Sequence, residues 1–300
     1  MARKNTKIRE SFGDQILQII TTIILWAILI LVAYPCIYVV ACSFSSSVAL
    51  EGGKVLLFPV DPTFDGYQLV FSYDQIWTGY RNTLFYTVSS VSITMVMQTL
   101  MAYPLSKNYY QGKKLVNTIL LIAMMTGAGM VPAFMLRKSL GMINTIWVVI
   151  LAGIVGISNV FILRTSFKSS IPGELFDAAR IDGANDFQCL VKIAVPLSKA
   201  TLSVLVLYSA VGCWNDYMTA LIYLNNPDMY PLQMFVRNLL SATTISGASG
   251  EDPDAIEKMN NALAQVKYGT IVVTTVPVLI LYAFVQKYFE KGVMVGSVKG

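Results

Sequence analysis

The chain of 300 residues contains no histidine, and this absence excludes several kinds of chemistry. Histidine is the most common metal ligand, the usual proton shuttle near neutral pH, and the base in Ser-His and Cys-His nucleophile pairs. The four cysteines (Cys36, Cys42, Cys189 and Cys213) show no CxxC spacing and mostly lie in apolar runs. We therefore interpret them as small buried side chains, and we predict no metal site and no catalytic residues.

Charged residues are also scarce, at 13% of the chain against 55% hydrophobic residues and a mean hydropathy of +0.60. A soluble protein carries roughly 25% charged residues, so much of this surface must face lipid. The net charge of +5 is spread over short segments without a basic stripe or interleaved aromatic residues, which argues against a nucleic-acid partner. The composition predicts an integral membrane protein.

Six apolar stretches are long enough, or nearly so, to cross a bilayer as helices of about 20 residues. They run approximately over residues 16–42, 82–105, 115–136, 144–163, 200–224 and 268–289. Of the 22 Lys and Arg residues, 15 fall on the side of both termini and seven on the other side. By the positive-inside rule the predicted fold is an all-α membrane protein with six spans and both termini in the cytoplasm.

This pattern divides the chain into a cytoplasmic N-terminus (1–15), a six-helix transmembrane domain (16–289) and a cytoplasmic tail (290–300). Two connections are long enough to carry a function, the cytoplasmic one at 164–199 and the external, acidic one at 225–267.

The cytoplasmic connection shows the signals of a helix, a break and a second helix. Pro172 suits the first turn of a helix, and Gly183 can adopt the positive φ that ends one. Asn185, with Gln188 three residues later, predicts a capping box that starts the second helix. We expect a stiff helical elbow.

The first helix of this elbow has a narrow face with little bulk. Leu175, Ala178 and Ala179 are spaced i, i+3 and i+4, with Asp177 and Arg180 beside them, and such a face can fit into a groove of another protein. The alternative is an amphipathic helix lying on the inner leaflet. That role favours Lys and Arg around bulky apolar residues, whereas this connection is nearly charge-balanced.

The same segment resembles a known motif. Asp177-Ala178-Ala179, three residues, Gly183, nine residues and then Ile193-Ala194-Val195-Pro196 is similar to EAA-x3-G-x9-I-x-L-P, the EAA loop of the membrane subunits of binding-protein-dependent ABC importers. Two positions depart from the pattern, because Asp177 replaces Glu and Val195 replaces Leu.

The resemblance covers nearly the whole chain and looks like the carbohydrate-uptake branch, in the subunit similar to the maltose-type second permease. It is carried by the segments Arg81-Asn82-Thr83, Ala102-Tyr103-Pro104-Leu105-Ser106, Trp214-Asn215-Asp216, Tyr230-Pro231-Leu232-Gln233 and 286–293. It implies a permease subunit of the bacterial cell membrane that imports a carbohydrate, and more specifically an oligosaccharide. Its implied partners are a second permease, two cytoplasmic ATPases and an external solute-binding protein.

By the same resemblance, residues 174–188 correspond to the coupling helix that docks into an ATPase, and 292–300 lie near the ATPase pair. The docking residues carried over by position are Glu174, Leu175, Asp177, Ala178, Ala179, Arg180, Asp182, Gly183 and Ala184. The chain has no G-x-x-x-x-G-K-[ST] motif, so we expect it to bind no cofactor itself and ATP with Mg to bind the partner ATPases.

Asp216 is the only acidic residue inside a predicted span, where a charge costs about 2.5–3.5 kcal/mol unless it faces water or a partner. With Trp214, Asn215 and Tyr217 it forms a candidate substrate-pathway cluster that could stack on a sugar and bind its hydroxyls. The alternative is a structural role, with Asp216 paired to Arg137, to Lys138 or to the other permease.

Other functions stay open at this point. An ABC importer of another small solute shares a looser form of the motif. A secondary transporter should show charged relays in several spans or paired repeats, and a membrane enzyme should show a convergent catalytic set, neither of which is visible. The external connection is expected to meet the binding protein, and glycines such as Gly127, Gly129, Gly153 and Gly156 are expected to interrupt spans.

Overall fold

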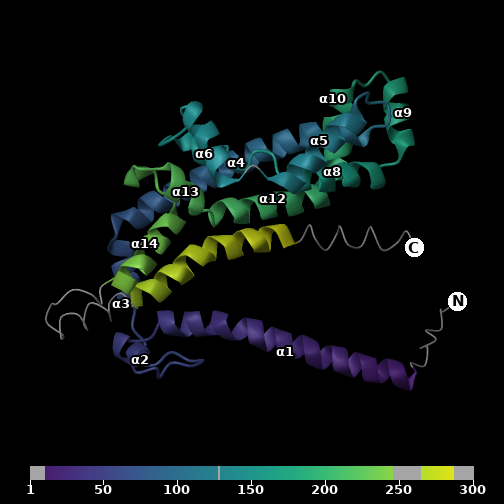
Figure 1. Cartoon of the computed structure of the whole chain (residues 1–300). Helices are drawn as coiled ribbons and strands as arrows, with labels where there is room; N and C mark the ends of the chain where they lie inside the picture. The colour runs from purple at the N-terminus through teal and green to yellow at the C-terminus, as the bar shows by residue number, and fades with distance from the viewer. Residues whose placement is uncertain (1–10, 128, 246–264, 287–300) are drawn as a thin grey trace. The chain divides into compact units, whose positions relative to one another are not determined.

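The computed structural model describes residues 11–127, 129–245 and 265–286, and every regular element within these ranges is a helix (Figure 1). These residues divide between two compact units, one drawn from Met1–Val70 and Thr243–Val272 and the other from Phe71–Ala242 and Val273–Gly300. The predicted all-α class is therefore confirmed for the described part of the chain.

The first unit is built around one long apolar helix. It contains α1 (Phe12–Ser43), α2 (Ser47–Glu51), most of α3 (Asp65–Ser72) and the start of the helix Gln265–Gln286. The 32 residues of α1 rise about 48 Å, which exceeds the roughly 30 Å of a hydrocarbon core. The amide nitrogen of Gln265 donates to the carbonyl of Ser45 at 3.0 Å and so fastens the start of the last helix within this unit.

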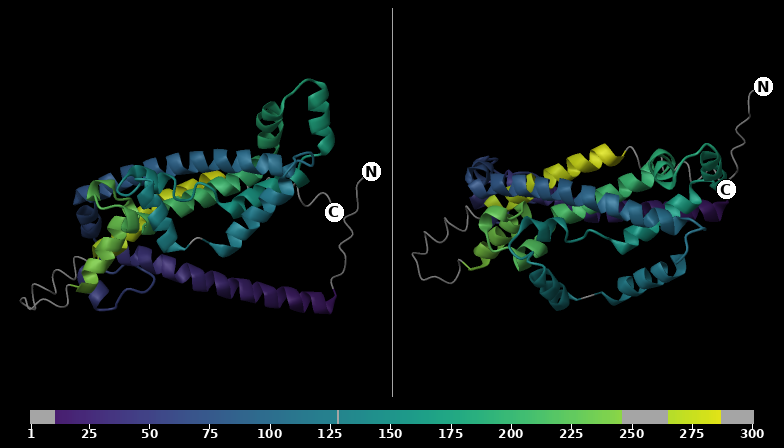
Figure 2. Two further views of the ribbon diagram at one scale, coloured as in Figure 1. Left: turned by 45° about the horizontal axis from the view of Figure 1, so that its top comes forward. Right: turned by 90° about the horizontal axis from the view of Figure 1, so that it is seen from above.

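The second unit has α4 as its central element. Its helices are α4 (Asp74–Ser106), α5 (Lys113–Thr126), α6 (Met130–Ser139), α7 (Ile146–Ile150), α8 (Ile157–Ser169), α9 (Gly173–Ile181), α10 (Asp186–Cys189), the π-helix η1 (Leu190–Ala194), α11 (Val195–Leu197), α12 (Lys199–Trp214), α13 (Met218–Tyr223), the 3₁₀-helix η2 (Pro227–Met229) and most of α14 (Leu232–Ile245). α8 and α12 pack along α4 (Figure 2). One apolar cluster joins α4, α8, α9 and η1, and a second gathers around α7 and α13.

Three of the predicted spans are single long helices, and the other three are interrupted. The first, second and sixth stretches correspond to α1, α4 and Gln265–Gln286, each long and apolar enough to cross a membrane. The described helices supply up to five spans if each bent helix pair counts as one. The number six therefore stays a prediction.

Glycine explains the bend in the third predicted span. α5 and α6 meet at an angle of 115°, and the turn uses positive φ values of 53° at Gly127 and 71° at Gly129 (Figure 2). These values lie where glycine has no steric penalty. The expected interruption at both glycines is confirmed.

The fourth and fifth predicted spans are broken rather than continuous. α7 ends at Ile150 and α8 begins only at Ile157, with Gly153 and Gly156 in the gap. In the fifth stretch α12 ends at Trp214 and α13 begins at Met218. Both breaks expose backbone polar groups within an apolar stretch, which is tolerated at membrane depth where the backbone lines a cavity.

Candidate functional site

The first half of the predicted elbow forms as the helix α9. Pro172 lies at the N-cap, one residue before the predicted first turn, and Glu174 lies in the first turn, where its charge complements the helix dipole. At the other end Gly183 adopts φ 82°, its N–H donates to the Arg180 carbonyl at 3.0 Å, and the Ala184 N–H donates to the Ala179 carbonyl at 2.8 Å. This pair of bonds is a Schellman ending, so Gly183 stops the helix as predicted.

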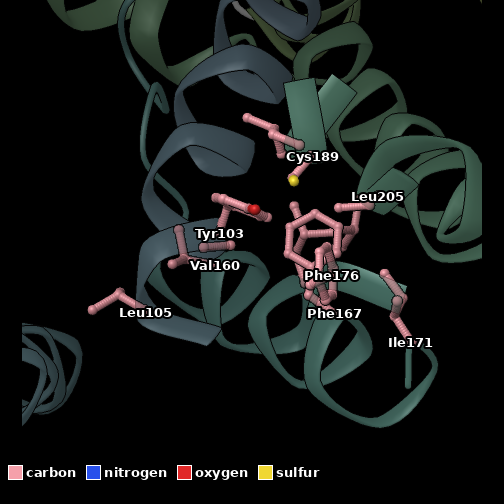
Figure 3. Packing of buried hydrophobic residues seen from close by; sticks show 12 residues of the cluster. Tyr103, Leu105, Val160, Phe167, Ile171, Phe176, Cys189 and Leu205 are labelled. Atoms are coloured by element: carbon pink, nitrogen blue, oxygen red, sulfur yellow. The ribbon is translucent and has the colours of Figure 1, made fainter. Parts of the chain in front are cut away.

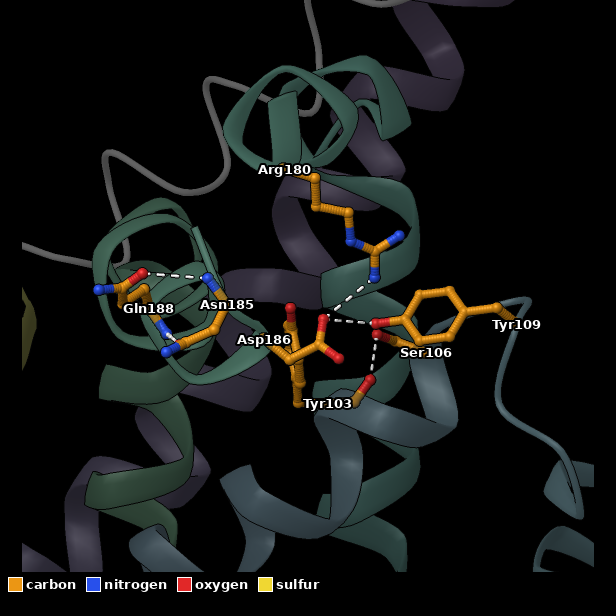
Figure 4. Close-up of polar contacts among 7 residues, drawn as sticks. All are labelled: Tyr103, Ser106, Tyr109, Arg180, Asn185, Asp186 and Gln188. Carbon is orange, nitrogen blue, oxygen red and sulfur yellow. Dashed lines mark hydrogen bonds and ion pairs between the residues drawn. The ribbon is translucent and has the colours of Figure 1, made fainter. Parts of the chain in front are cut away.

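The second half begins with the predicted capping box. The Gln188 N–H donates to Asn185 Oδ1 at 2.8 Å, and the Asn185 N–H donates to Gln188 Oε1 at 3.0 Å (Figure 4). α10 continues into the π-helix η1 and then into α11. The segment from α10 to α11 meets the following helix α12 at a bend of 81°. The elbow thus consists of two short helices, and hydrogen bonds fix both the end of α9 and the start of α10.

An aromatic side chain anchors the elbow to the helical bundle. Phe176 of α9 is only 8% exposed, and its ring lies 6.3 Å from the Tyr103 ring of α4 in an edge-on arrangement. Phe167 of α8 contacts the same Tyr103 ring at 6.2 Å (Figure 3). Edge-on pairs of this kind contribute about 0.5–1.5 kcal/mol beyond the burial of the rings. α9 is therefore packed against both α4 and α8.

A polar contact fastens the far end of α9. Arg180 and Asp186 form an ion pair at 3.0 Å, and the Tyr109 hydroxyl donates to the same carboxylate oxygen at 2.8 Å (Figure 4). The Arg180 guanidinium also lies 4.2 Å from the centre of the Tyr109 ring. The hydrogen bonds from Tyr109 and then Arg180 lower the pKa of Asp186 below its ordinary value of 3.8, so this carboxylate is ionised at neutral pH.

Lys107, at the end of α4, lies beneath the elbow. Its ammonium group sits over the Phe176 ring and 4.7 Å from the centre of the Tyr103 ring. Burial, with a smaller contribution from Arg180, lowers the pKa of Lys107 to about 8. A cation over aromatic rings adds to the contact between α9 and α4.

The structure divides the predicted docking residues between two faces. The exposed residues are Glu174, Leu175, Asp177, Ala178, Arg180, Asp182 and Gly183. Ala179 and Ala184 are instead half-buried against the cluster around Phe176. Ile181, which sequence reasoning missed, is 87% exposed and adjoins Ala178 on the outward side. The available signal was spacing, because Ile181 follows Ala178 by three residues and so shares its face of a helix.

A second candidate site is a polar cavity of about 330 Å³ inside the second unit. It is lined by side chains of α4, α8, α12 and α13 and by the interrupted stretch between α7 and α8. Its polar lining includes Ser90, Thr94, Gln98, Arg137, Asn159 and Asp216.

The four predicted pathway residues do not converge on this cavity. Asp216 lines it, whereas Trp214 is buried toward the last helix, where its Nε1–H donates to the Thr274 carbonyl at 3.1 Å. Asn215 is exposed and accepts from Gln233 at 3.3 Å, and Tyr217 is also exposed. The break after α12 turns these neighbouring side chains in different directions.

Asp216 is held by a residue that sequence reasoning did not consider. The N–H and the hydroxyl of Thr219 donate to its two carboxylate oxygens, at 3.0 Å and 2.5 Å, at the start of α13. In the described residues Asp216 forms no ion pair with Arg137 or Lys138. Two hydrogen bonds from Thr219, rather than an ion pair, therefore satisfy this carboxylate.

The polar lining from α4 was also missed, although a signal was present. Ser90, Thr94 and Gln98 follow one another at four-residue intervals and are all buried. Polar residues repeating at helical spacing inside an apolar stretch indicate a face turned away from lipid.

Comparison with known proteins identifies relatives over nearly the full length. A family model, described as binding-protein-dependent transport system inner membrane component, matches residues 8–295. The polygalacturonan/rhamnogalacturonan transport system permease protein YtcP of Bacillus subtilis (strain 168) is 35% identical over 266 residues, covering 89% of this chain and 92% of that protein. Protein LplC of the same organism is 34% identical over 269 residues, covering 89% of each chain.

A comparison with solved structures also finds an ABC transporter. One chain of a bacterial ABC transporter involved in the import of the acidic polysaccharide alginate superposes with a TM-score of 0.82 at 32% identity, covering 93% of this chain and 99% of that one. The chain therefore belongs to the family of binding-protein-dependent transport system inner membrane components, as an integral membrane permease subunit of an ABC transporter rather than an enzyme.

Proposed function

We propose that the chain is the permease subunit of an ATP-driven importer of carbohydrate, specifically of oligosaccharides, and forms the translocation pathway with a second permease. The similarity to YtcP and to the alginate transporter, both named for saccharide transport, supports the substrate class. The observation that carries the proposal is the hydrogen-bonded elbow with an exposed face around Ala178 and Ile181.

The elbow is suited to pass force from a cytoplasmic motor into the bundle. α9 continues from α8 and, through α10 and η1, leads into α12, while Phe176 connects it to α4. A push on its exposed face therefore reaches α4, α8 and α12, three of the helices that line the polar cavity. Two partner ATPases, which bind ATP and Mg, supply that push.

The proposal includes the membrane topology of the chain and an external partner. The chain is a multi-pass protein of the bacterial cell membrane, with six spans and both termini in the cytoplasm, consistent with the distribution of Lys and Arg. An external solute-binding protein delivers the saccharide to the connection at 225–267, of which residues 246–264 lie outside the described part of the chain, as do 292–300.

The test uses Ile181→Arg, because this side chain touches solvent and not the core. We expect the variant to insert and to retain the second permease, but to lose the ATPase on co-purification and to lose ATP-dependent uptake. The matched control is Ser169→Arg, which adds the same charge to an exposed position of the same connection outside α9. Retention of the ATPase by Ile181→Arg with normal uptake would refute the docking assignment.

Ala179→Arg is a less suitable variant for this purpose. Because Ala179 is half-buried against the apolar cluster, a large charged side chain there would distort the elbow itself.

A further inference from the structure

The polar cavity contains a buried amide without a partner. Gln98 is 1% exposed, and neither its Nε2 nor its Oε1 has a hydrogen-bond partner among the residues that the structure describes. A buried amide in this state destabilises the fold, so its retention in an apolar helix needs a reason. One donor and one acceptor on the same group match the adjacent hydroxyls of a sugar ring.

A glycine packs closely against this amide. A Cβ atom placed on Gly156 would lie 3.1 Å from Gln98 Nε2 and 3.2 Å from Asn159 Nδ2. The backbone at Gly156 has φ −75°, which other residues adopt without strain. Gly156→Ala would thus disturb the close packing against two side-chain amides and leave the backbone conformation unstrained.

The two charged side chains that line the cavity, Asp216 and Arg137, differ in how fully they are hydrogen-bonded. The carboxylate of Asp216 is engaged by Thr219, whereas Arg137 donates, among the described residues, one long hydrogen bond of 3.4 Å to the Ala152 carbonyl. The Arg137 guanidinium is oriented by the Tyr223 ring, 4.6 Å from its centre. A guanidinium has five N–H donors and binds carboxylates through two of them, so Arg137 has capacity for an anionic solute.

The size of the cavity also suits a solute. Its volume of about 330 Å³ lies at the lower end of the range for small-molecule sites, roughly 300–1,000 Å³. A bridging water would fill only about a tenth of it. Ser90, Thr94 and Gln98 extend the polar wall over about 12 Å of α4.

We propose that this cavity is a subsite for one uronic acid residue of the transported saccharide. Arg137 contacts the carboxylate, and the amides of Gln98 and Asn159 contact ring hydroxyls. This inference rests on the proposed import function and adds to it the acidic class of the sugar and the residues of this chain that meet it.

The test measures uptake into proteoliposomes that contain the assembled importer and its solute-binding protein. Two probes are compared at saturating concentration, trigalacturonic acid and its methyl ester, which keeps the hydroxyls and loses the negative charge. The binding protein is the same for every variant, so a change in the acid-to-ester ratio of uptake rates arises in the permease.

We expect Arg137→Gln to lower the acid-to-ester ratio about tenfold or more, since a charged hydrogen-bonded pair is lost. The control is Lys138→Gln, which removes the neighbouring exposed cation and should leave the ratio unchanged. Gln98→Leu and Gly156→Ala should slow both probes severalfold while the ratio stays constant. Gln98→Leu should leave thermal stability unchanged or raised, because it removes an unpaired buried amide.

Three results would overturn the inference in different ways. An unchanged ratio in Arg137→Gln refutes the carboxylate contact, and unchanged uptake in both Gln98→Leu and Gly156→Ala refutes the hydroxyl contacts. A wild-type importer that moves a neutral oligosaccharide but neither probe refutes the uronic acid assignment and leaves the proposed function standing. A wild-type importer that moves no saccharide refutes the proposed function itself.

Discussion

Removal of the Phe176 ring should release the elbow from the bundle far more than removal of the Arg180–Asp186 ion pair. Truncation of a buried phenylalanine to alanine costs about 3–5 kcal/mol, and the lower end applies because Phe176 retains 8% exposure. The ion pair joins side chains that are 39% and 56% exposed, and such pairs contribute about 0–1 kcal/mol. Apolar packing, not charge, should therefore hold the elbow in place.

Amide hydrogen exchange of residues 172–189 in the lipid-embedded complex measures this difference. A loss of about 3 kcal/mol corresponds to roughly a hundredfold faster exchange, because each 1.4 kcal/mol is a factor of ten. We expect Phe176→Ala to show about this acceleration, Phe176→Leu a smaller one, and Asp186→Asn a change of at most about fivefold. If Asp186→Asn accelerated exchange as much as Phe176→Ala, the argument from burial would be refuted.

Three further predictions concern single contacts. Gly183→Ala should destabilise the elbow by about 1–2 kcal/mol, because alanine resists the φ of 82°, and exchange at residues 179–185 should accelerate accordingly while a Ser169→Ala control stays unchanged. Asn82→Ala should lower the thermal midpoint of the purified complex, since the Asn82 amide donates to the carbonyls of Asp228 and Tyr230 at 2.7 Å and 3.1 Å; an unchanged midpoint would contradict this. Because the folded pKa of Asp186 is depressed, its contribution should be complete well above the ordinary value of 3.8 and lost as the pH falls through the lower folded value. Below the pKa of Lys107, protease resistance of the elbow should therefore be constant from pH 7 to 5 and decline only below that, a decline that Asp186→Asn should lack.

The elbow was predictable because its signals are local. The helix end at Gly183 and the capping box at Asn185 and Gln188 depend on residues within one or two turns of each other. The anchor at Phe176 was not predictable, since its burial depends on Tyr103, which is more than 70 residues away in the chain.

The substrate pathway was less accessible to sequence reasoning for two physical reasons. The expected grouping of Trp214 with Asp216 assumed one continuous helix, and the break after Trp214 sends the two side chains to different surroundings. The search for a cation near Asp216 overlooked Thr219, three residues on, whose backbone N–H and hydroxyl both donate to the carboxylate.

The central claim is that this chain moves solute only when a separate ATPase drives it through the elbow. The direct measurement is accumulation of an oligosaccharide in proteoliposomes that contain both permeases and the solute-binding protein, with and without the ATPase subunits and ATP. We predict accumulation only with both ATPase and ATP, and its loss when Ile181→Arg is introduced. Accumulation driven by an ion gradient in vesicles that lack the ATPase would contradict the account.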